Sequence, residues 1–403
     1  MSSNVKYVVV GGAGAMGRIT VRDLVETCPK TSDIEIVIAD YDAAKATAQA
    51  AGYKDARVKA VRVDVKNHTE AARALAGAFV LINAAQYQLN IDVMEIALLL
   101  KAHYIDLGGL FHITRKQLEL SERFVAVKRT ALLGMGAAPG ITNILSRMGA
   151  DQLDTVTEIH ARVGSMDATR YEPVPALAVA YSLQTILEEF SFEPAVFTKG
   201  EFKFVKPMSG DVPHRFPPPI GVRRPMYTIH SEVATLPLSF KSKGCRECSF
   251  KIAFDPEFTD RVRFLRDMGM GSHDMVEVAG GTRVRPIDVV NKVAMSQPTP
   301  KQVGKLKQYE VVRAIVKGTK NGKKLTIISD LHTAGMPAWG VGLDIDTGTP
   351  PAVAAQMLAA GEITVTGAVP AEIAVPPAPF FKRLKLRKMT VKTTKKAGWA
   401  FAT

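Results

Sequence analysis

The sequence has few cysteines and no long apolar run, and both absences narrow the class of protein. Its 403 residues include only three cysteines, Cys28, Cys245 and Cys248, too few for a disulfide framework and typical of a reducing compartment. Cys245 and Cys248 form one CxxC pair, but no second pair supplies the other ligands of a zinc site, so no metal is expected. No apolar run reaches the roughly 18 residues of a membrane span, and residues 1–12 lack the features of a signal peptide. We therefore expect a cytoplasmic protein.

Acidic residues are scarce relative to basic ones. The chain has 52 Lys and Arg against 39 Asp and Glu, a formal net charge of +13. Part of the excess is local, because residues 382–396 are rich in Lys and Arg and contain no acidic residue. This composition predicts a solvated, partly disordered basic tail over 376–403, with docking on an anionic partner as the alternative. No zinc-finger spacing or RNA-recognition aromatic motif accompanies it, so nucleic-acid binding is not expected.

The first 152 residues alternate short apolar runs with helical patterns. The runs expected to form strands are residues 5–10, 34–39, 58–63, 79–83, 104–107 and 131–134. The helices expected between them are residues 16–26, 43–51, 69–75, 91–101 and 116–128. Nearly continuous Val and Ile runs are typical of strands buried on both faces, and this spacing indicates right-handed βαβ units. The pattern predicts an α/β fold with a doubly wound parallel sheet of the Rossmann type over 1–152.

The pattern changes after about residue 153, where strand-like segments become longer and alternate in polarity. Asn321-Gly322 lies between two such segments and predicts a hairpin. Proline-rich stretches at 173–175 and 213–219 interrupt this part. We expect a second, mixed α+β domain over 153–333, followed by a helix near 351–360 that Gly361 stops.

A glycine-rich loop joins the first predicted strand to the first helix. Gly12 permits the tight turn, Gly14 lets the backbone approach a pyrophosphate, and Gly17 lets the helix pack closely on the strand. Ala15 and Met16 open the helix, whose N-terminal N–H groups suit phosphate oxygens. Because this GxGxxG sits between a strand and a helix, it predicts a dinucleotide-binding site.

Asp40 ends the second predicted strand, where an acidic residue can accept hydrogen bonds from the ribose hydroxyls. A carboxylate would repel a 2′-phosphate, and the next residues, Tyr41 and Asp42, are not basic. The alternative role for Asp40 is a helix N-cap, which Asp42 can fill instead. We therefore expect NAD rather than NADP.

Other residues at the carboxyl ends of the strands should trace the rest of the cofactor cleft. The third strand delivers the adenine side and the fourth ends at the switch point of the sheet, where two small alanines leave room for the nicotinamide ribose. The residues expected there are Asp64, Val65, Asn83, Ala84, Ala85 and Gln86.

Several strings, in order along residues 5–375, resemble the saccharopine dehydrogenase-like oxidoreductases, and within that family the NAD-dependent lysine 6-dehydrogenases most. They are VVVGGAGAMGRITVRDL, IVIADYDAAKA, LINAAQYQLN, YIDLGGLFHIT, GMGAAPGITNIL, YSLQTILEEF, YTIHSEVATLPLSF and RVRPIDVV. The resemblance implies a Rossmann domain completed by residues 334–375, a substrate-binding and dimerisation domain, and a homodimer. The GGLFHIT string is one residue shorter than in the lysine enzymes, and the basic tail is unlike theirs.

The resemblance also implies chemistry at a carbon–nitrogen bond. Lysine 6-dehydrogenases oxidise the ε-amine to an imine, which hydrolyses to a semialdehyde that cyclises, whereas saccharopine and carboxynorspermidine enzymes run related chemistry reductively. The leading prediction is therefore oxidative deamination of a basic amino acid. Reductive condensation of an amine with a carbonyl is the alternative. A third possibility is a non-catalytic NAD-binding protein whose basic tail binds a partner.

Such chemistry needs a group that takes a proton from an ammonium nitrogen near the nicotinamide. Asp106 ends the fifth predicted strand, His112 follows on the same loop and would titrate near neutrality, and Tyr87 could hydrogen-bond the amine. Each could instead serve a structural purpose. Pro139 lies in a loop expected beside the nicotinamide carboxamide.

Residues from the second half of the chain are expected to contact the substrate. Arginines are candidates because a guanidinium fits a carboxylate bidentately, and the others match strings of the family that face the cleft. The candidates are Asn143, Arg170, Arg223, His230 and Thr235.

Overall fold

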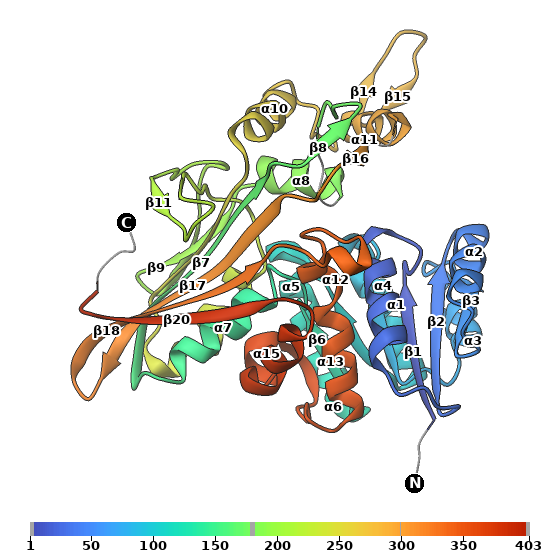
Figure 1. Ribbon diagram of the computed structural model, residues 1–403, viewed down its shortest axis with the longest axis horizontal. Helices are drawn as coiled ribbons and strands as arrows, with labels where there is room; N and C mark the ends of the chain where they lie inside the picture. The colour runs from blue at the N-terminus through green and yellow to red at the C-terminus, as the bar shows by residue number, and fades with distance from the viewer. Residues whose placement is uncertain (1–3, 178–181, 299, 400–403) are drawn as a thin grey trace.

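The computed structural model describes residues 4–177, 182–298 and 300–399, which form two seven-stranded sheets joined by helices (Figure 1). The first sheet has the order β19-β6-β5-β4-β1-β2-β3, and every neighbouring pair is parallel. Its strands are β1 (Val5–Val10), β2 (Ile34–Asp40), β3 (Val58–Arg62), β4 (Val80–Asn83), β5 (His103–Asp106), β6 (Thr130–Leu133) and β19 (Gly367–Pro370). This arrangement confirms the predicted doubly wound fold, with ligand-binding loops expected where β1 and β4 diverge.

Helices cover both faces of the first sheet. They are α1 (Ala15–Thr27), α2 (Ala43–Tyr53), α3 (His68–Ala74), α4 (Asn90–Leu100), α5 (Leu110–Leu118) and α6 (Ser121–Ala126). The single helix predicted over 116–128 is wrong, because two helices stand there and the first begins directly after Gly109. As a consequence His112 lies in a helix and not in a loop.

The chain returns to this first domain after residue 333. Helices α12 (Ile345–Gly348) and α13 (Pro350–Ala359) pack against α1. Thr20 Oγ1 donates to the Gly348 carbonyl at 2.7 Å, and a Cβ on Gly348 would lie only 2.5 Å from Ile19 Cβ. Strand β19 then pairs with β6 and extends the sheet.

The second sheet is mixed, with the order β10-β9-β13-β7-β17-β18-β20. Only β13 and β7 run parallel in it. Its strands are β7 (Thr155–Asp167), β9 (Ala195–Thr198), β10 (Glu201–Phe204), β13 (Glu247–Ala253), β17 (Gln308–Lys320), β18 (Lys323–Thr333) and β20 (Thr390–Ala397). The predicted hairpin is confirmed: Asn321 and Gly322 connect β17 to β18 with φ angles of 51° and 73°.

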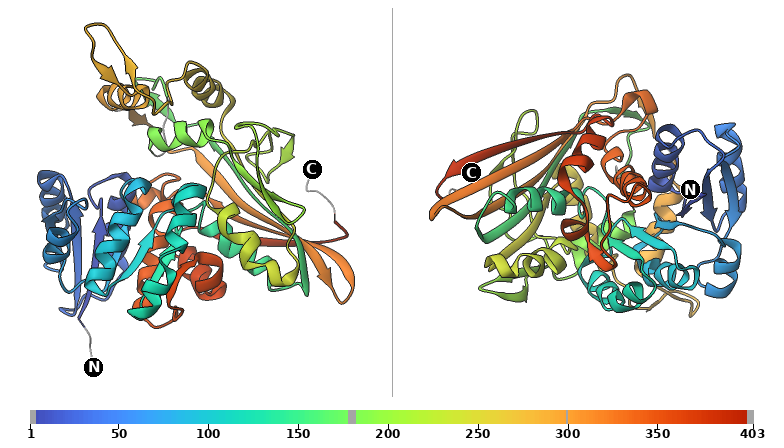
Figure 2. Two further views of the ribbon diagram at one scale, coloured as in Figure 1. Left: turned by 180° about the vertical axis from the view of Figure 1, so that it is seen from behind. Right: turned by 90° about the horizontal axis from the view of Figure 1, so that it is seen from below.

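Two helices lie between the sheets and face the inner side of the second one (Figure 2). They are α7 (Ile141–Ala150), which follows β6, and α9 (Glu232–Ser239), which precedes β13. Gly149 of α7 lets the helix approach β17, because a Cβ there would lie 2.8 Å from Val316 Cγ2. Alternate residues of β13 therefore point toward the first domain, and the others toward the opposite, outer face of the sheet.

A separate lobe, which we call the arm, stands away from the first sheet (Figure 1). It contains α8 (Leu183–Ser191), α10 (Pro256–Asp267) and α11 (Pro286–Ser296), together with the strand pairs β8 (Arg170–Glu172) with β16 (Lys301–Val303) and β14 (Val276–Glu277) with β15 (Arg283–Val284). Leu187, Phe190, Val262 and Ile287 belong to its own apolar core. One face of α8 therefore packs into the apolar core of the arm.

The remaining short elements connect these layers. They are the 3-10 turns η1 (Tyr87–Leu89), η2 (Lys241–Lys243) and η3 (Pro337–Trp339), the strands β11 (His214–Arg215) and β12 (Val222–Arg223), and the helix α14 (Ala371–Ala374). Each helix of the described residues is too short or too polar to cross a bilayer.

The predicted disorder of the basic tail over 376–403 is wrong for the described part, which ends at residue 399, although most of its basic side chains are exposed as predicted. Helix α15 (Pro377–Lys385) buries Phe380 and Leu384, and β20 adds an edge strand to the second sheet. Arg387 is buried and forms a two-pronged ion pair with Asp23 of α1. The prediction relied on the many charges of this segment and did not consider the apolar residues spaced between them.

Removal of the Arg387 guanidinium should destabilise the fold, because it leaves Asp23 buried without its cation. We expect Arg387→Met to lower the free energy of unfolding by about 3–5 kcal/mol, measured by urea denaturation. Lys385→Met, at an exposed position of the same segment, should change it by less than about 0.5 kcal/mol. Equal stability of the two variants would contradict the role given to this ion pair.

A candidate active site between the two sheets

The glycine loop has the close contacts that a dinucleotide-binding turn requires. A Cβ on Gly17 would lie 2.2 Å from the Gly11 carbonyl oxygen, and one on Gly12 would lie 2.8 Å from the Val9 carbonyl oxygen. Gly14 is the N-cap of α1, and no described side chain caps that helix. The N–H groups at Ala15 and Met16 therefore point toward the place where phosphate oxygens bind in such folds. The loop fits the pyrophosphate of a dinucleotide.

Asp40 braces this loop from the end of β2. Its Oδ2 accepts a hydrogen bond from the Ala13 N–H and its Oδ1 one from the Asp42 N–H, both at 3.0 Å. Arg62, at the end of β3, is the register partner of Asp40, and its guanidinium lies 5.1 Å from the centre of the Tyr41 ring. The sequence analysis missed Arg62, because only the pairing of β2 with β3 brings it beside the carboxylate.

The end of β4 meets the glycine loop. A Cβ on Gly11 would lie 2.8 Å from the Ala85 nitrogen, so the predicted Ala84-Ala85 pair lies directly against the loop. Asn83 accepts from the Ala85 N–H at 3.1 Å and donates to Asn90, which fixes this turn.

The other predicted strand-end residues have distinct surroundings. Gln86 lies 3.5 Å from Gln184 of α8 and links the first domain to the arm. Asp64 accepts from the Lys66 N–H at 3.0 Å, and Val65 is buried beneath it. Asp64 therefore shapes the turn after β3.

Asp106 is fully buried and uses both oxygens to hold neighbouring loops. Oδ1 accepts from the N–H groups of Gly108 and Gly134, each at 2.8 Å, and Oδ2 accepts from Gln117 Nε2 at 2.6 Å. Burial raises the pKa of this carboxyl group despite these hydrogen bonds. This environment favours a positioning role over the general-base role that the sequence suggested.

Pro139 lies where the loops after β5 and β6 meet. A Cβ on Gly108 would lie 2.8 Å from Pro139 Cδ, and one on Gly134 would lie 2.8 Å from Pro139 Cγ. Both glycines have positive φ angles, 132° and 70°. The proline ring thus occupies the space that side chains at positions 108 and 134 would fill, and it closes this side of the site.

His230 is buried between two glutamates on the inner face of the second sheet. Its Nδ1 lies 2.8 Å from Glu232 Oε2, its Nε2 lies 3.7 Å from Glu189 Oε1, and its ring stacks on Phe250 at 3.8 Å between centroids. Burial disfavours the charged ring, but Glu232 and Glu189 together raise the pKa of His230 above its ordinary value. An imidazolium between carboxylates can act as a general acid.

Hydrogen bonds connect this histidine to helix α7 of the first domain. Glu232 accepts from Thr142 Oγ1 at 2.8 Å. The next residue, Asn143, donates to Glu372 at 2.8 Å and to Thr235 at 3.3 Å. The predicted residues Asn143, His230 and Thr235 therefore do come together in one buried polar cluster.

Glu188, which precedes Glu189 in α8, forms a second carboxylate centre. Glu188 accepts hydrogen bonds from Tyr87 Oη at 2.8 Å and from Gln88 and Gln184. His273 Nε2 lies 2.9 Å from Glu188 Oε1 without forming a hydrogen bond to it. Burial, and then the charge of Glu188, raise the pKa of Tyr87. The predicted Tyr87 thus faces the site as a hydrogen-bond donor.

Glu188 and Glu189 were quoted in the sequence only as part of a family string, although both are buried, at 0% and 3% exposure. Glutamates in a helix are usually solvated, so burial of two in succession marks a functional site. Helix α8 is enclosed because the arm covers one face while Tyr87 and Gln88 of the first domain contact another. An adjacent Glu pair inside an apolar helix was the available signal.

Three predicted site residues lie outside this cluster. His112 is exposed and stacks on Phe204, with 5.7 Å between ring centroids. Arg170 is on the exposed strand β8 and pairs with Glu172. Arg223, in the β11–β12 pair, donates to the adjacent Val222 carbonyl. The structure thus brings none of the three to the cluster.

The two cysteines of the CxxC pair are buried free thiols. Burial raises the pKa of Cys245 to about 12, which disfavours the thiolate that metals bind. Within the described ranges, no group of three or more His, Cys, Asp or Glu side chains is arranged to hold a metal ion.

The glycine loop and the parallel sheet define a dinucleotide-binding fold, and a buried polar cluster lies beside it at the second sheet. Comparison with known families then places the chain in one of them. The saccharopine dehydrogenase NADP binding domain matches residues 8–132, and the saccharopine dehydrogenase C-terminal domain matches residues 136–389. The chain therefore belongs to the saccharopine dehydrogenase family, as the sequence resemblance predicted.

Two curated relatives are carboxynorspermidine synthases, one from Vibrio cholerae and one from Vibrio alginolyticus, each 23% identical to this chain. The first match covers 62% of this chain and 61% of the relative, and the second covers 61% and 60%. The chain thus matches about three fifths of the length of these relatives.

Among solved structures, the L-Glu-forming saccharopine dehydrogenase of Saccharomyces cerevisiae superposes with a TM-score of 0.71. It covers 98% of this chain and 100% of that one, at 16% identity. This match shows a common fold.

If Asp106 positions the loops, its replacement should lower the stability of the fold. Asp106→Asn puts an amide N–H where a carboxylate accepts from three donors, so we expect the free energy of unfolding to fall by about 1–3 kcal/mol. Asp64→Asn, in an exposed turn, is the control. A variant that unfolds like the native chain but has lost its chemical step would instead identify Asp106 as the general base.

Proposed function

We propose that this protein catalyses nicotinamide-dependent oxidoreduction at the carbon–nitrogen bond of a cationic amine, in the direction that joins the amine to a carbonyl carbon. The observation that supports this proposal most is two buried carboxylate centres next to the loops of the cofactor domain: Glu189 and Glu232 beside His230, and Glu188 beside Tyr87. Carboxylates are costly to bury unless cations pair with them. His230 offsets part of this charge, and an ammonium group beside Glu188, which accepts hydrogen bonds from the neutral groups of Tyr87, Gln88 and Gln184, would supply more.

The two carboxylate centres suit different parts of an amine substrate. Tyr87 and Glu188 offer a hydroxyl and a carboxylate from the side of the cofactor domain. Glu189 and His230 Nε2 lie 3.7 Å apart, beyond direct hydrogen-bond length. A substrate nitrogen or oxygen placed near both can exchange a proton with the imidazole while Glu232 holds Nδ1.

His230 is the residue to which we assign the acid–base role. Condensation of an amine with a carbonyl expels water, and that oxygen must receive a proton before it leaves. The imidazolium of His230 supplies it, and the Glu232 carboxylate keeps the ring charged. A nicotinamide dinucleotide, when bound, supplies or accepts the hydride.

The residues for that cofactor are those of the glycine loop and Asp40. The loop fits the pyrophosphate, and Asp40 keeps lone pairs for ribose hydroxyls after accepting its two backbone hydrogen bonds. On this basis we propose NAD. Arg62, stacked on Tyr41 beside Asp40, is the observation that favours NADP as the second candidate, because a guanidinium can pair with a 2′-phosphate.

Oxidative deamination of a basic amino acid remains the second candidate for the reaction. The same carboxylates suit the ammonium group of a basic side chain, and the sequence strings favour the lysine 6-dehydrogenases. The reductive direction is preferred because the curated relatives are named carboxynorspermidine synthases and belong with enzymes that join an amine to a carbonyl.

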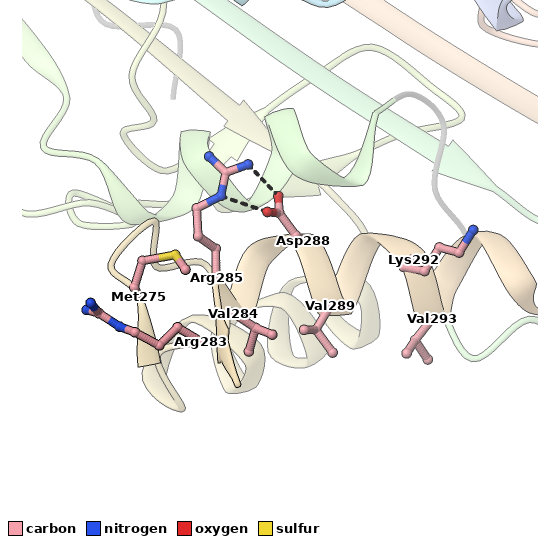
Figure 3. A pocket seen from close by; sticks show the side chains of 8 residues that line it. All are labelled: Met275, Arg283, Val284, Arg285, Asp288, Val289, Lys292 and Val293. Carbon is pink, nitrogen blue, oxygen red and sulfur yellow. Dashed lines mark hydrogen bonds and ion pairs between the residues drawn. The ribbon is translucent and has the colours of Figure 1, made fainter. Parts of the chain in front are cut away.

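Assembly as a homodimer is also a proposal, and the arm supports it. Nine of the 21 large apolar side chains that are exposed in the described chain lie between residues 264 and 303. A cavity of about 480 Å³ opens on this surface (Figure 3). Its lining residues are Met275, Arg283, Val284, Arg285, Asp288, Val289, Lys292 and Val293. An apolar patch of this kind is typical of an interface.

A substrate panel tests the reaction. Lysine, ornithine, arginine and short diamines are assayed at 340 nm, alone with the oxidised cofactors and together with aldehydes or keto acids and the reduced cofactors, using NAD and NADP forms in parallel. We expect consumption of the reduced cofactor only when amine and carbonyl are both present, and faster with NADH. Reduction of the oxidised cofactor by a single amine would favour deamination. Inactivity in every combination would contradict both reactions.

The pH dependence of the same assay tests His230. Its activity as an acid should fall as the pH rises through its raised pKa, and Glu232→Gln should move that fall to lower pH because it removes a stabilising charge. We also expect kcat of Glu232→Gln to be about ten- to a hundred-fold lower than that of the native chain. His112→Gln, outside the cluster, should leave the profile unchanged. An unshifted profile in Glu232→Gln would exclude His230 as the acid.

Light scattering after gel filtration tests the dimer. Val293→Lys places a cation among Arg283 and Lys292 in the proposed contact, so we expect the variant to elute as a monomer at micromolar concentration while the native chain is a dimer. Val365→Lys, exposed elsewhere on the molecule, should behave like the native chain. Native protein that is monomeric, or a Val293→Lys dimer, would contradict this use of the arm.

A further inference from the structure

The outer face of the second sheet carries a group of cations behind the candidate active site. Phe250 of β13 points inward and stacks on His230. Its neighbours Ser249 and Lys251 point to the opposite face, since successive side chains of a strand alternate. The cations described below therefore lie on the other side of the sheet from the proposed chemistry.

Three cationic residues are aligned across adjacent strands on this face. Lys251 of β13 is the register partner of Arg162 on β7, which in turn is the partner of Arg313 on β17. Arg313 is neutralised, because its Nε and NH2 groups donate to Asp330 at 2.6 and 2.8 Å. In the part of the chain that the structure describes, the other two cations have no such counterion.

The contacts of Arg162 are all with neutral oxygens. Its NH1 group donates to the carbonyls of Ala161 and Ser249, at 2.7 and 3.2 Å, and its NH2 group donates to Ser249 Oγ at 3.1 Å. Within the described residues its Nε–H makes no hydrogen bond. Arg162 is partly exposed, and burial lowers the pKa of its guanidinium to about 10.

Lys251 is nine-tenths buried, at 6% exposure. Its Nζ donates to the Gly210 carbonyl and lies 4.2 Å from the centre of the Tyr227 ring. In the described parts of the chain no carboxylate lies within 4 Å of Lys251 or of Arg162. Gly210 is held close, because a Cβ there would lie 2.4 Å from the Tyr227 ring.

Neighbouring groups register the uncompensated positive charge. Burial, and then Arg313, Arg162 and Lys251, lower the pKa of His214 to about 3. Burial and Arg162 likewise lower the pKa of Lys251 to about 8. Asp211 opposes this effect on Lys251, but its carboxylate pairs with Arg224 at 3.2 Å. Two adjacent cations with no carboxylate in contact favour a bound anion.

We propose that Arg162 and Lys251 form a binding site for a small oxoanion on the outer face of the second sheet. The Nε–NH2 edge of Arg162 offers the planar fork that a carboxylate or phosphate accepts. Lys251 adds a second cation from the adjacent strand, while the Ser249 hydroxyl is already held by Arg162 and by His160 Nδ1, at 3.1 and 2.8 Å. The site is independent of the proposed reaction and requires no amine or dinucleotide.

Titration calorimetry of the full chain at constant ionic strength tests the site. Inorganic phosphate and succinate are the two probes, with chloride as the reference ion, and the tighter probe identifies which oxoanion the site prefers. We expect saturable binding of one anion per chain. Arg162→Gln and Lys251→Met should each weaken it at least about tenfold. Lys323→Met, at an exposed lysine near the end of the same sheet, should bind like the native chain.

Two results would overturn the proposal. One is heat from phosphate and succinate that equals that from chloride. The other is binding that persists in both Arg162→Gln and Lys251→Met. Circular dichroism checks that the variants fold, and Arg162→Lys replaces Arg162→Gln if the latter unfolds, with the same loss expected because the fork is gone.

Proton uptake gives a second readout that a merely structural role would not produce. The groups that face the Lys251 ammonium are Arg162 of β7, the Tyr227 ring, Asp211 and the Gly210 carbonyl. A bound anion raises the pKa of Lys251 from about 8, so binding should take up protons near pH 8.5 and weaken as the pH rises further. Succinate is suitable because its own carboxyl groups do not titrate there. Uptake that remains in Lys251→Met would assign the protons elsewhere and contradict this site.

Discussion

The buried carboxylate of Glu232 connects the two halves of the candidate active site. One oxygen accepts from Thr142 in the helix that leaves the first sheet, and the other holds His230 at the second sheet. An anion at 0% exposure is stable only while such partners surround it. The position of the acid–base residue relative to the cofactor loops therefore depends on this interaction.

Other buried polar contacts support the same geometry from each side. Asp106 holds the loops after β5 and β6, and Pro139 fills the space that two glycines leave between them. The Arg387–Asp23 pair anchors the C-terminal segment to the helix of the glycine loop before β20 joins the second sheet. Because this segment contacts both domains, it limits how they can sit relative to each other.

The sequence predicted the features that local patterns determine. Runs of Val and Ile located six of the seven strands of the first sheet to within a residue or two at their ends, and the glycine spacing located the phosphate loop, because these signals arise from neighbours along the chain. Strand β19 was not predicted. Burial is a property of the whole fold. Asp106 therefore looked like a catalytic base although the structure surrounds it with donors, and Glu188 and Glu189 went unnoticed as site residues.

Contacts between segments that are distant along the chain could not be predicted from the sequence either. Arg62 lies next to Asp40 only through strand register, and the basic residues near the C-terminus conceal the apolar side chains that bury α15. His112 was chosen because an imidazole suits proton transfer, yet its helix directs it to Phe204. A residue type suggests a chemistry, but only tertiary contacts decide whether it reaches the site.

The central claim is that buried glutamates beside the cofactor loops recognise a cationic amine. Calorimetry with the reduced cofactor present can compare 1,3-diaminopropane with 3-aminopropan-1-ol, which replaces one ammonium with a hydroxyl, in the native chain and in Glu188→Gln. We expect the native chain to bind the diamine at least about tenfold more tightly, since one charge-assisted contact distinguishes the two, and Glu188→Gln to lose this preference. Equal affinity of the native chain for both compounds would contradict it.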